Sequence, residues 1–324
     1  MIYSVRHVTT FRYEPAVRES VMEVRLHPRS DGDQRCLSFT LSVDPATHLM
    51  QYHDFAGNIV HHFDIAGTHS QLKVTAQSAV EVNAAPAPRS VDAGDWADLD
   101  AFVSSGDHWE MLLPSTFVQP GDLLEEFARE VKCERRNSPL ELLIELNEQI
   151  YKLFSYVPNS TNVDSPIEEA LQARQGVCQD FAHIMIALVR RLKVPCRYVS
   201  GYMFHRDQRK PETSQDRSLE GASHAWVEAL IPRLGWVAFD PTNNLVGADR
   251  HIRVATGRDY ADVPPTRGVH KGEAQSELTV SVTVSPADAA VPEPARPSLV
   301  VRSRRPMLVR AAAMRVEQEQ QQQQ

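Results

Sequence analysis

The sequence is short of cysteine and has no long apolar run. Its four cysteines are scattered and form no CxxC pair: Cys36, Cys133, Cys178 and Cys196. This pattern excludes a disulfide framework and gives no indication of structural zinc. No segment approaches the ~18 apolar residues of a membrane-spanning helix, and the start MIYSVRHVTTFRYEP lacks the unbroken apolar core of a secretory signal. We therefore expect a protein of the reducing cytoplasm without a membrane partner.

An excess of positive charge is also missing. The chain has 34 Lys and Arg against 42 Asp and Glu, a formal net charge of -8. That balance excludes the basic footprint of a nucleic-acid-binding protein and leaves proteins or peptides as the expected substrates. The composition, 42% hydrophobic and 23% charged, is that of an ordinary globular protein, and 324 residues are enough for two packed domains. The oligomeric state stays open.

Two-residue alternation dominates residues 1–85, which we expect to form an all-β, sandwich-like domain. The strand-like runs cover residues 2–13, 20–28, 37–45, 52–65 and 72–82. Residues 86–112 are rich in Pro, Ala and Asp and have no sustained period, so they are interpreted as a linker that carries a helical turn at its end. Residues 287–324 combine Pro, Ala and Arg with a glutamine run and are expected to be a disordered tail.

Residues 113–265 change to helical spacing and then return to strands, which indicates an α+β core. Helices are expected near residues 122–131 and from Ser138, a capping residue, to about 150. A further helix would have Asp164 or Ser165 as its cap and Pro166 at its first position. The next apolar stripe runs from Cys178 to about 192, and three strand-like runs follow: CRYVSGYMF, SHAWVEALI and WVAFDPT. Residues 266–286 form a return segment with one strand.

Cys178 is the first candidate for chemistry because it lies in the first turn of a predicted helix. A cysteine becomes a strong nucleophile when a helix N-terminus and a neighbouring imidazolium stabilise its thiolate. The histidine in turn needs a carboxylate or amide that fixes its tautomer. His224 and Asp240, on two successive strand-like runs, are the candidates for these two roles.

The hairpin that carries His224 and Asp240 has to bring them together. Side chains alternate along strands, so the spacing places each of them on the face that bears the tryptophan of its own run. We predict a register in which Asp240 faces His224 and Trp236 faces Glu228, with a wide loop that begins at 229 or 230 and ends at 235. A hairpin that paired Ile231 with Trp236 would separate the two groups by roughly 10 Å, at ~3.3 Å per residue, and would contradict the triad.

Simpler interpretations compete with a catalytic one. A lone cysteine near an amphipathic helix start, such as Cys178, is more often small core filler, and Cys196, which follows Pro195 at a strand start, is interpreted as a core residue. His183, five residues after Cys178, projects from another side of the helix and is interpreted as structural. Five histidines gather in the N-terminal region: His48, His53, His61, His62 and His69. They lack a metal-ligand spacing such as HExxH, so we predict no metal and no cofactor.

Three sequence blocks give the chain a family resemblance. QGVCQDFAHIMIALVRRLKVPCRYVSGY, SHAWVEALI and GWVAFDPTNN resemble the core of the transglutaminase-like superfamily, and their compact spacing is similar to that of bacterial members, as is the β-rich N-terminal region. The resemblance spans roughly residues 1 to 285. It implies a papain-like fold in which Cys178 is the nucleophile, His224 the general base and acid, and Asp240 the residue that orients the histidine.

The resemblance also implies acyl transfer from an amide through a thioester at Cys178. We favour hydrolysis, as in a cysteine protease or amidase, because the chain has no DxDxDG calcium loop and no tryptophan between Trp109 and Cys178. Transamidation by lysine or a polyamine is the alternative, and a non-catalytic protein-binding scaffold is a third reading. The backbone N–H of Cys178 would be one oxyanion donor. Tyr156 is the candidate for the second.

Overall fold

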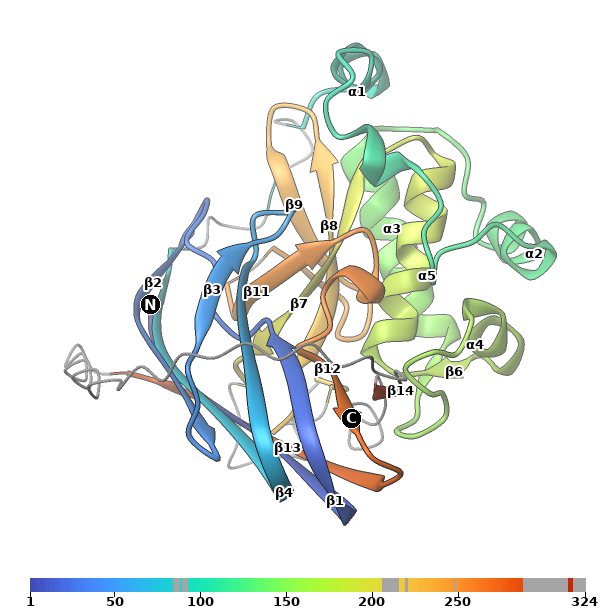
Figure 1. Cartoon of the computed structure of the whole chain (residues 1–324). Coiled ribbons are helices and arrows are strands. Elements are labelled where there is room, and N and C mark those ends of the chain that lie inside the picture. Colours follow the sequence, from blue (N-terminus) through green and yellow to red (C-terminus); the bar gives the residue numbers. More distant parts are fainter. Residues whose placement is uncertain are drawn as a thin grey trace.

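The computed structural model describes residues 1–83, 88, 93–205, 216–218, 221–247, 249–287 and 314–316. Much of the expected linker 86–112 lies within these ranges, whereas the expected tail 287–324 lies outside them except for residues 287 and 314–316. Figure 1 shows the helices on one side, the strands β7, β8 and β9 in the middle, and the long N-terminal strands on the other side. The predicted α+β class, with a β region ahead of a mixed core, is confirmed.

A seven-stranded antiparallel sheet forms the N-terminal side. Its strands are β1 (Ile2–Val24), β2 (Gln34–Asp44), β3 (Met50–His53), β4 (Ile59–Val82), β12 (Thr266–Lys271), β13 (Gln275–Pro286) and β14 (Met314–Val316). The runs at 2–13 and 20–28, predicted as separate strands, join in β1, because a bulge between Arg12 and Glu19 absorbs the residues between them while pairing with β4 continues.

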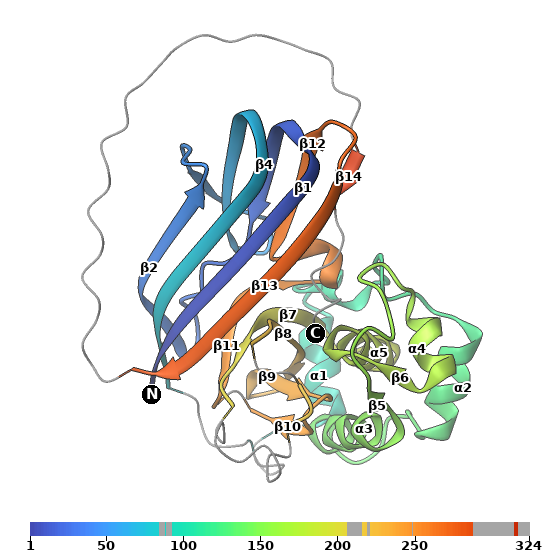
Figure 2. The same ribbon diagram turned by 90° about the horizontal axis from the view of Figure 1, so that it is seen from below.

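The C-terminal part of the chain completes this N-terminal sheet. β12 and β13 both pair with β1, where one strand was expected in the return segment. Figure 2 shows β4, β1 and β13 as long neighbouring ribbons. Apolar side chains from both ends of the chain, including Phe11, Phe63 and Leu278, pack into one buried cluster. The sheet is therefore one continuous hydrogen-bonded unit.

Helices cover the opposite side of the molecule. They are α1 (Trp96–Val103), η2 (Trp109–Leu112), α2 (Asp122–Glu130), α3 (Pro139–Leu153), α4 (Ile167–Ala173), α5 (Cys178–Arg191) and η4 (Tyr260–Asp262). Ser138 caps α3 as predicted: its Oγ accepts from the Glu141 N–H at 3.2 Å. No helix in the described part of the chain is both long and apolar enough to cross a membrane.

The predicted start of α4 was wrong by one residue. Pro166 is extended, with φ -69° and ψ 152°, so it is the N-cap and Ile167 begins the helix. Ser165 does not cap the helix, because its hydroxyl accepts from the Asn162 N–H at 3.1 Å and donates to the Glu169 carboxylate at 2.7 Å. The local hydrogen bonds of Ser165 therefore compete with the expected cap.

The central sheet has five antiparallel strands in the order β10-β9-β8-β7-β11. They are β7 (Cys196–Met203), β8 (His224–Ile231), β9 (Gly235–Asp240), β10 (Leu245–Val246) and β11 (His251–Gly257). A short parallel pair, β5 (Ser155–Tyr156) and β6 (Gln175–Gly176), lies just ahead of α5. α5 packs against this sheet, and Phe181 of the helix shares the main core with Val227 and Phe239 of the strands. Burial of these side chains holds the start of α5 in place relative to β8 and β9.

Candidate active site

Cys178 begins α5, as the sequence predicted, and its side chain is buried. The first turn is fixed by Asp180, whose carboxylate accepts from the Val177 N–H at 2.8 Å and from the Thr161 hydroxyl at 2.6 Å. Burial raises the pKa of Asp180 to about 6, although both hydrogen bonds act in the opposite direction. These contacts set the direction of the backbone at the start of the helix, where the N–H groups and the helix dipole favour negative charge.

The predicted hairpin register was wrong, although the two candidate groups still meet. The structure pairs Leu230 with Trp236 and Ile231 with Gly235, so continuing the ladder places Asp240 opposite Trp226, two residues from the expected position. The turn is tighter than predicted because Arg233 and Gly235 adopt positive φ values of 65° and 75°. A shift of two residues keeps side chains on the same face, and side chains of diagonal neighbours still reach one another.

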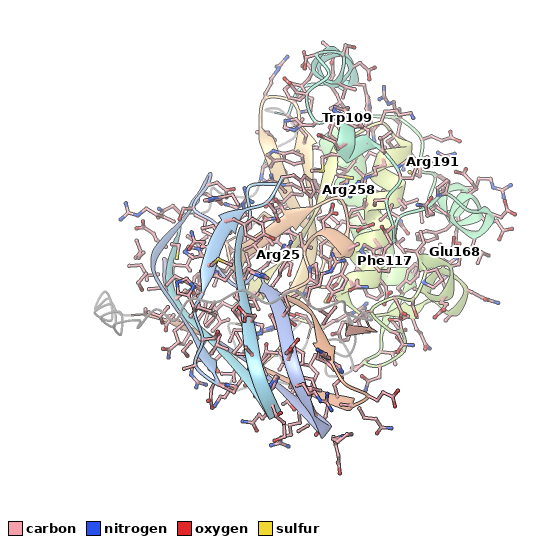
Figure 3. The ribbon with its side chains drawn as sticks, viewed as in Figure 1. Arg25, Trp109, Phe117, Glu168, Arg191 and Arg258 are labelled. Carbon is pink, nitrogen blue, oxygen red and sulfur yellow. The ribbon has the colours of Figure 1, made fainter. Side chains whose placement is uncertain are left out.

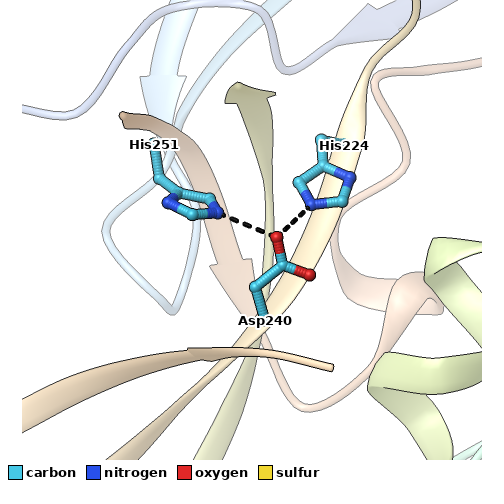
Figure 4. Close-up of side chains that lie close together, drawn as sticks. All are labelled: His224, Asp240 and His251. Carbon is cyan, nitrogen blue, oxygen red and sulfur yellow. Dashed lines mark hydrogen bonds and ion pairs between the residues drawn. The ribbon is translucent and has the colours of Figure 1, made fainter. Parts of the chain in front are cut away.

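Asp240 is the centre of a buried hydrogen-bonded group (Figure 4). Its Oδ2 lies 2.8 Å from Nε2 of His224 and 3.1 Å from Nε2 of His251. The Asn243 amide also donates to Oδ2, at 2.8 Å. The backbone N–H groups of Thr242 and Asn243 donate to Oδ1 at 3.0 and 3.2 Å. Because an ionised carboxylate only accepts hydrogen bonds, both histidines donate to Asp240 from Nε2. Nδ1 of His224 is not used by the carboxylate and is therefore the atom available to Cys178.

The pKa values of the pair shift in opposite directions. Burial alone would lower the pKa of His224, but the charge and hydrogen bond of Asp240 outweigh it, and a hydrogen bond with Cys178 raises it further. Burial alone would raise the pKa of Asp240, but the charge of His224 and the hydrogen bonds from both histidines hold it well below its usual range. The arrangement therefore favours an imidazolium at His224, beside the sulfur of Cys178.

Only one group of potential metal ligands occurs in the described part of the chain, and it is the trio His224, Asp240 and His251. The ligand atoms lie within 4.8 Å of one another. The two oxygens of Asp240 already accept from five donors. A cation would have to displace these hydrogen bonds, so the trio fits a hydrogen-bonded relay better than a metal centre.

The remaining sequence candidates lie in separate environments. Tyr156 is half-buried in β5, and its backbone pairs with Gly176, two residues before Cys178. Cys196 is buried in the core, as predicted, and burial raises the pKa of its thiol to about 11. His183 is also a core residue, as predicted: its ring stacks on Phe117, which Figure 3 labels, with centroids 5.5 Å apart. No disulfide joins any of the four cysteines, all of which the structure describes.

Sequence reasoning missed His251, Thr242 and Asn243. Thr242 and Asn243, the second and third residues after Asp240, belong to the block AFDPTNN, so their backbone contacts to the carboxylate follow from a tight turn at the strand end. No local signal identified His251, because its position depends on the pairing of β11 with β7. Only the assembled sheet brings it to Asp240.

Comparisons with known proteins show which family the chain resembles. Residues 3–81 match the bacterial transglutaminase-like N-terminal region, and residues 125–241 match the transglutaminase-like superfamily. An uncharacterised protein of Mycobacterium leprae is 31% identical over 281 residues, which cover 87% of this chain and 97% of that protein. A protein-glutamine gamma-glutamyltransferase of Pseudomonas aeruginosa is 31% identical over 91 residues, which cover 28% of this chain and 13% of that protein.

A solved structure has the same overall fold. A candidate cysteine protease from Cytophaga hutchinsonii has a TM-score of 0.71 to this chain at 23% identity, and the match covers 90% of this chain and 92% of that one. The matched core spans α2 to β9 and ends just beyond Asp240. Family models match both the N-terminal region and the core, and the Mycobacterium leprae relative is similar over 87% of this chain. The chain therefore belongs to the transglutaminase-like superfamily.

Proposed function

We propose that the protein is a thiol acyl-transfer enzyme that hydrolyses peptide or side-chain amide bonds, in the manner of a cysteine protease or amidase. The observation that carries the proposal is the buried pair of His224 and Asp240, 2.8 Å apart, together with Cys178 at a helix N-terminus, whose sulfur raises the pKa of that histidine. Cys196, buried in the same core, has different partners: its sulfur lies 3.7 Å from the carbonyl oxygen of Ile186, and its charged neighbour is Arg190.

In the proposed reaction the Cys178 thiolate attacks the carbonyl carbon of an amide. The new C–S bond turns the carbonyl oxygen into an oxyanion, which the backbone N–H of Cys178 stabilises. His224 gives its proton to the amide nitrogen as the C–N bond breaks, so the amine leaves and a thioester remains. His224 then takes a proton from water, the hydroxide attacks the thioester, the C–S bond breaks, and a carboxylic acid is released while the Cys178 thiolate and the His224 imidazolium are restored. Asp240 keeps the imidazole oriented through both steps.

Tyr156 is the proposed second oxyanion donor. Its strand pairs with β6, which leads directly into Cys178, so the tyrosine and the nucleophile are held by adjacent backbone segments. The ring packs edge-on against Phe181 of α5 at 6.4 Å. Tyr156→Phe removes only the hydroxyl. We expect it to lower kcat with little change in KM if the hydroxyl stabilises the oxyanion, since that interaction forms only in the transition state.

Transamidation is the competing activity, because an amine and water attack the same thioester. The likeness to the Pseudomonas aeruginosa glutamyltransferase supports it over a short stretch of the core. The substrate we propose in either case is a protein or peptide, and the net charge of -8 is consistent with a partner that is not nucleic acid.

The test uses the full-length protein and its Cys178→Ala and Cys196→Ala variants. One sample of each is treated with iodoacetamide, a separate untreated sample is incubated with a panel of peptide amides, with and without a primary amine, and adducts and products are followed by mass spectrometry. We expect Cys178 to be alkylated much faster than Cys196 and amide cleavage to vanish only in Cys178→Ala. Equal labelling of the two cysteines would favour the non-catalytic scaffold, and incorporation of the amine would favour transamidation.

A further inference from the structure

A second histidine touches the carboxylate that orients His224. His251 is the first residue of β11, it pairs with Met203 of β7, and its side chain is fully buried. Its Nε2 lies 3.1 Å from the Asp240 oxygen that His224 also contacts. Strands β7 and β8 lie between β11 and β9 in the sheet, so the contact crosses the face of two strands. Neighbouring strand pairing does not create it.

Gly201 and Trp226 make room for this crossing. A Cβ at Gly201 would lie 2.6 Å from Cη2 of Trp226 and 2.1 Å from the carbonyl oxygen of Ile252, so no side chain fits there. The Trp226 ring is completely buried and packs against His251 with centroids 4.8 Å apart. It also lies 6.1 Å from the His224 ring. The imidazole of His251 is therefore confined by packing as well as by its hydrogen bond.

The N-terminal side of the molecule holds the strand that carries His251. The Gln34 side chain accepts from the Arg253 N–H at 2.7 Å and donates to the Arg253 carbonyl at 2.8 Å. The Asn58 side chain does the same for Thr256, at 2.8 and 2.9 Å. Two amide side chains thus bond the backbone of this edge strand in place of a further strand. They bond the strand that carries His251 on the side opposite its pairing with β7.

His251 acts as a hydrogen-bond donor to Asp240 through Nε2, and packing holds its ring in place. Its Nδ1 is buried and has no hydrogen-bond partner among the residues that the structure describes. A neutral ring with hydrogen on Nε2 satisfies Asp240 without burying an unpaired N–H, whereas a charged ring would bury one. The other donors to the carboxylate are the Asn243 amide, the imidazole of His224 and the backbone N–H groups of Thr242 and Asn243. Arg250, which pairs with Asp216 at 2.8 Å, is the nearby guanidinium.

We propose that His251 is a positioning residue for the reaction: it fixes the Asp240 carboxylate in the orientation that reaches His224, and the N-terminal sheet contributes to the site by holding β11. The inference rests on the proposed function of Cys178. Without this donor Asp240 keeps its four other hydrogen bonds, but Oδ2 loses one of its three donors, so the carboxylate is held less firmly toward His224 and stabilises the imidazolium less. A weaker imidazolium stabilises the Cys178 thiolate less.

The test compares His251→Phe with His251→Gln in the full-length protein. Phenylalanine keeps a ring in the buried space but has no donor, whereas the glutamine Nε2 can occupy the place of the histidine Nε2. We expect His251→Phe to lower kcat for the cleaved peptide amide about 10- to 100-fold with KM nearly unchanged, as for loss of a hydrogen bond to a charged group. We expect His251→Gln to recover most of the loss.

A second readout separates positioning from mere support of the fold. The rate of Cys178 alkylation is measured against pH, and we expect its acid limb to move to higher pH in His251→Phe because the thiolate is less stabilised. His183→Phe is the matched control: it also removes a buried imidazole, but His183 contacts the Tyr260 N–H at 3.2 Å and not Asp240. It should leave the pH profile unchanged even if it melts at a lower temperature.

Each outcome has a distinct meaning. A wild-type alkylation profile in His251→Phe overturns the inference and leaves the proposed function standing, whereas slow alkylation of Cys178 in the wild type overturns the proposed function itself. If His251→Phe does not fold, His251→Gln is compared with His251→Asn, whose shorter amide does not reach Asp240, and equal rates overturn the inference. Equimolar zinc in the purified protein, whose removal changes the alkylation rate, would also overturn it, because His251 would then be a ligand.

Discussion

Replacement of Asp180 by asparagine should change how the stability of the protein depends on pH. Asp180 is 2% exposed, two residues after Cys178, and its carboxylate accepts from the Val177 N–H and the Thr161 hydroxyl. Two effects oppose each other there. The helix N-terminus favours the charged carboxylate by at most about 2 kcal/mol, whereas burial favours the neutral acid. Burial dominates, because the pKa is raised from 3.8 to about 6.

The magnitude follows from the difference between the folded and unfolded values. Between pH 3.8 and about 6 the folded protein binds more protons at this group than the unfolded chain does, so the stability of the wild type falls as pH rises through that window. At 1.36 kcal/mol per pH unit the total is about 3 kcal/mol. Asparagine does not ionise and can still accept from Val177. The free energy of unfolding of Asp180→Asn, relative to wild type, should therefore rise by about 3 kcal/mol from pH 4 to pH 7.

Thermal melting of both proteins across this pH range measures the effect, because all other titrating groups are common to the pair. About 3 kcal/mol corresponds to roughly 6 to 12 °C in the difference between the two melting temperatures. Glu141→Gln is the matched control: Glu141 holds the same position in the first turn of α3 but is exposed. Removal of an exposed charge changes stability by about 0.5 kcal/mol or less. A flat difference for Asp180→Asn, or one of opposite sign, would refute the dominance of burial.

Two further substitutions test the packing around the site. Glu228 is 1% exposed and lies 2.6 Å from Arg197 and 3.4 Å from Arg253. Glu228→Gln removes the charged partner of the Arg197 guanidinium and one of the acidic neighbours of Arg253, and it should cost about 3 to 5 kcal/mol in urea unfolding. A loss below about 1 kcal/mol would show that the other acidic neighbours of Arg253 suffice. Gly201→Ala forces a Cβ to within 2.1 Å of the Ile252 carbonyl oxygen, so we expect a lower melting temperature and slower Cys178 alkylation. An unchanged melting temperature would contradict the close approach of β7 and β11.

The local elements of the site could be predicted because their signals lie within a few residues of one another. The apolar stripe from Cys178 to about 192 predicted α5, and the structure has it at Cys178–Arg191. Alternation along the strands placed His224 and Asp240 on faces that meet, and they do. The capping residue Ser138 was predicted for the same reason, since a cap depends on a side chain and a backbone group three residues apart.

The register and the third partner of Asp240 could not be predicted in this way. The hairpin register depends on the positive φ angles of Arg233 and Gly235, and the alternation pattern is unchanged by a shift of two residues. The contact of His251 with Asp240 depends on the order of four strands and on the space above Gly201. The spacing of neighbouring residues determines neither the hairpin register nor the contact of His251 with Asp240.

The sequence by itself therefore determined which side chains could form a nucleophile, a base and an orienting acid, because helix starts and strand faces are set by short-range periodicity. The tertiary structure alone decided how Asp240 is held. Its five hydrogen-bond donors come from β8, β11 and the turn after β9, and β11 in turn depends on Gln34 and Asn58 of the N-terminal side. Contacts between segments roughly 200 residues apart arise from the packing of whole elements, which no local pattern specifies.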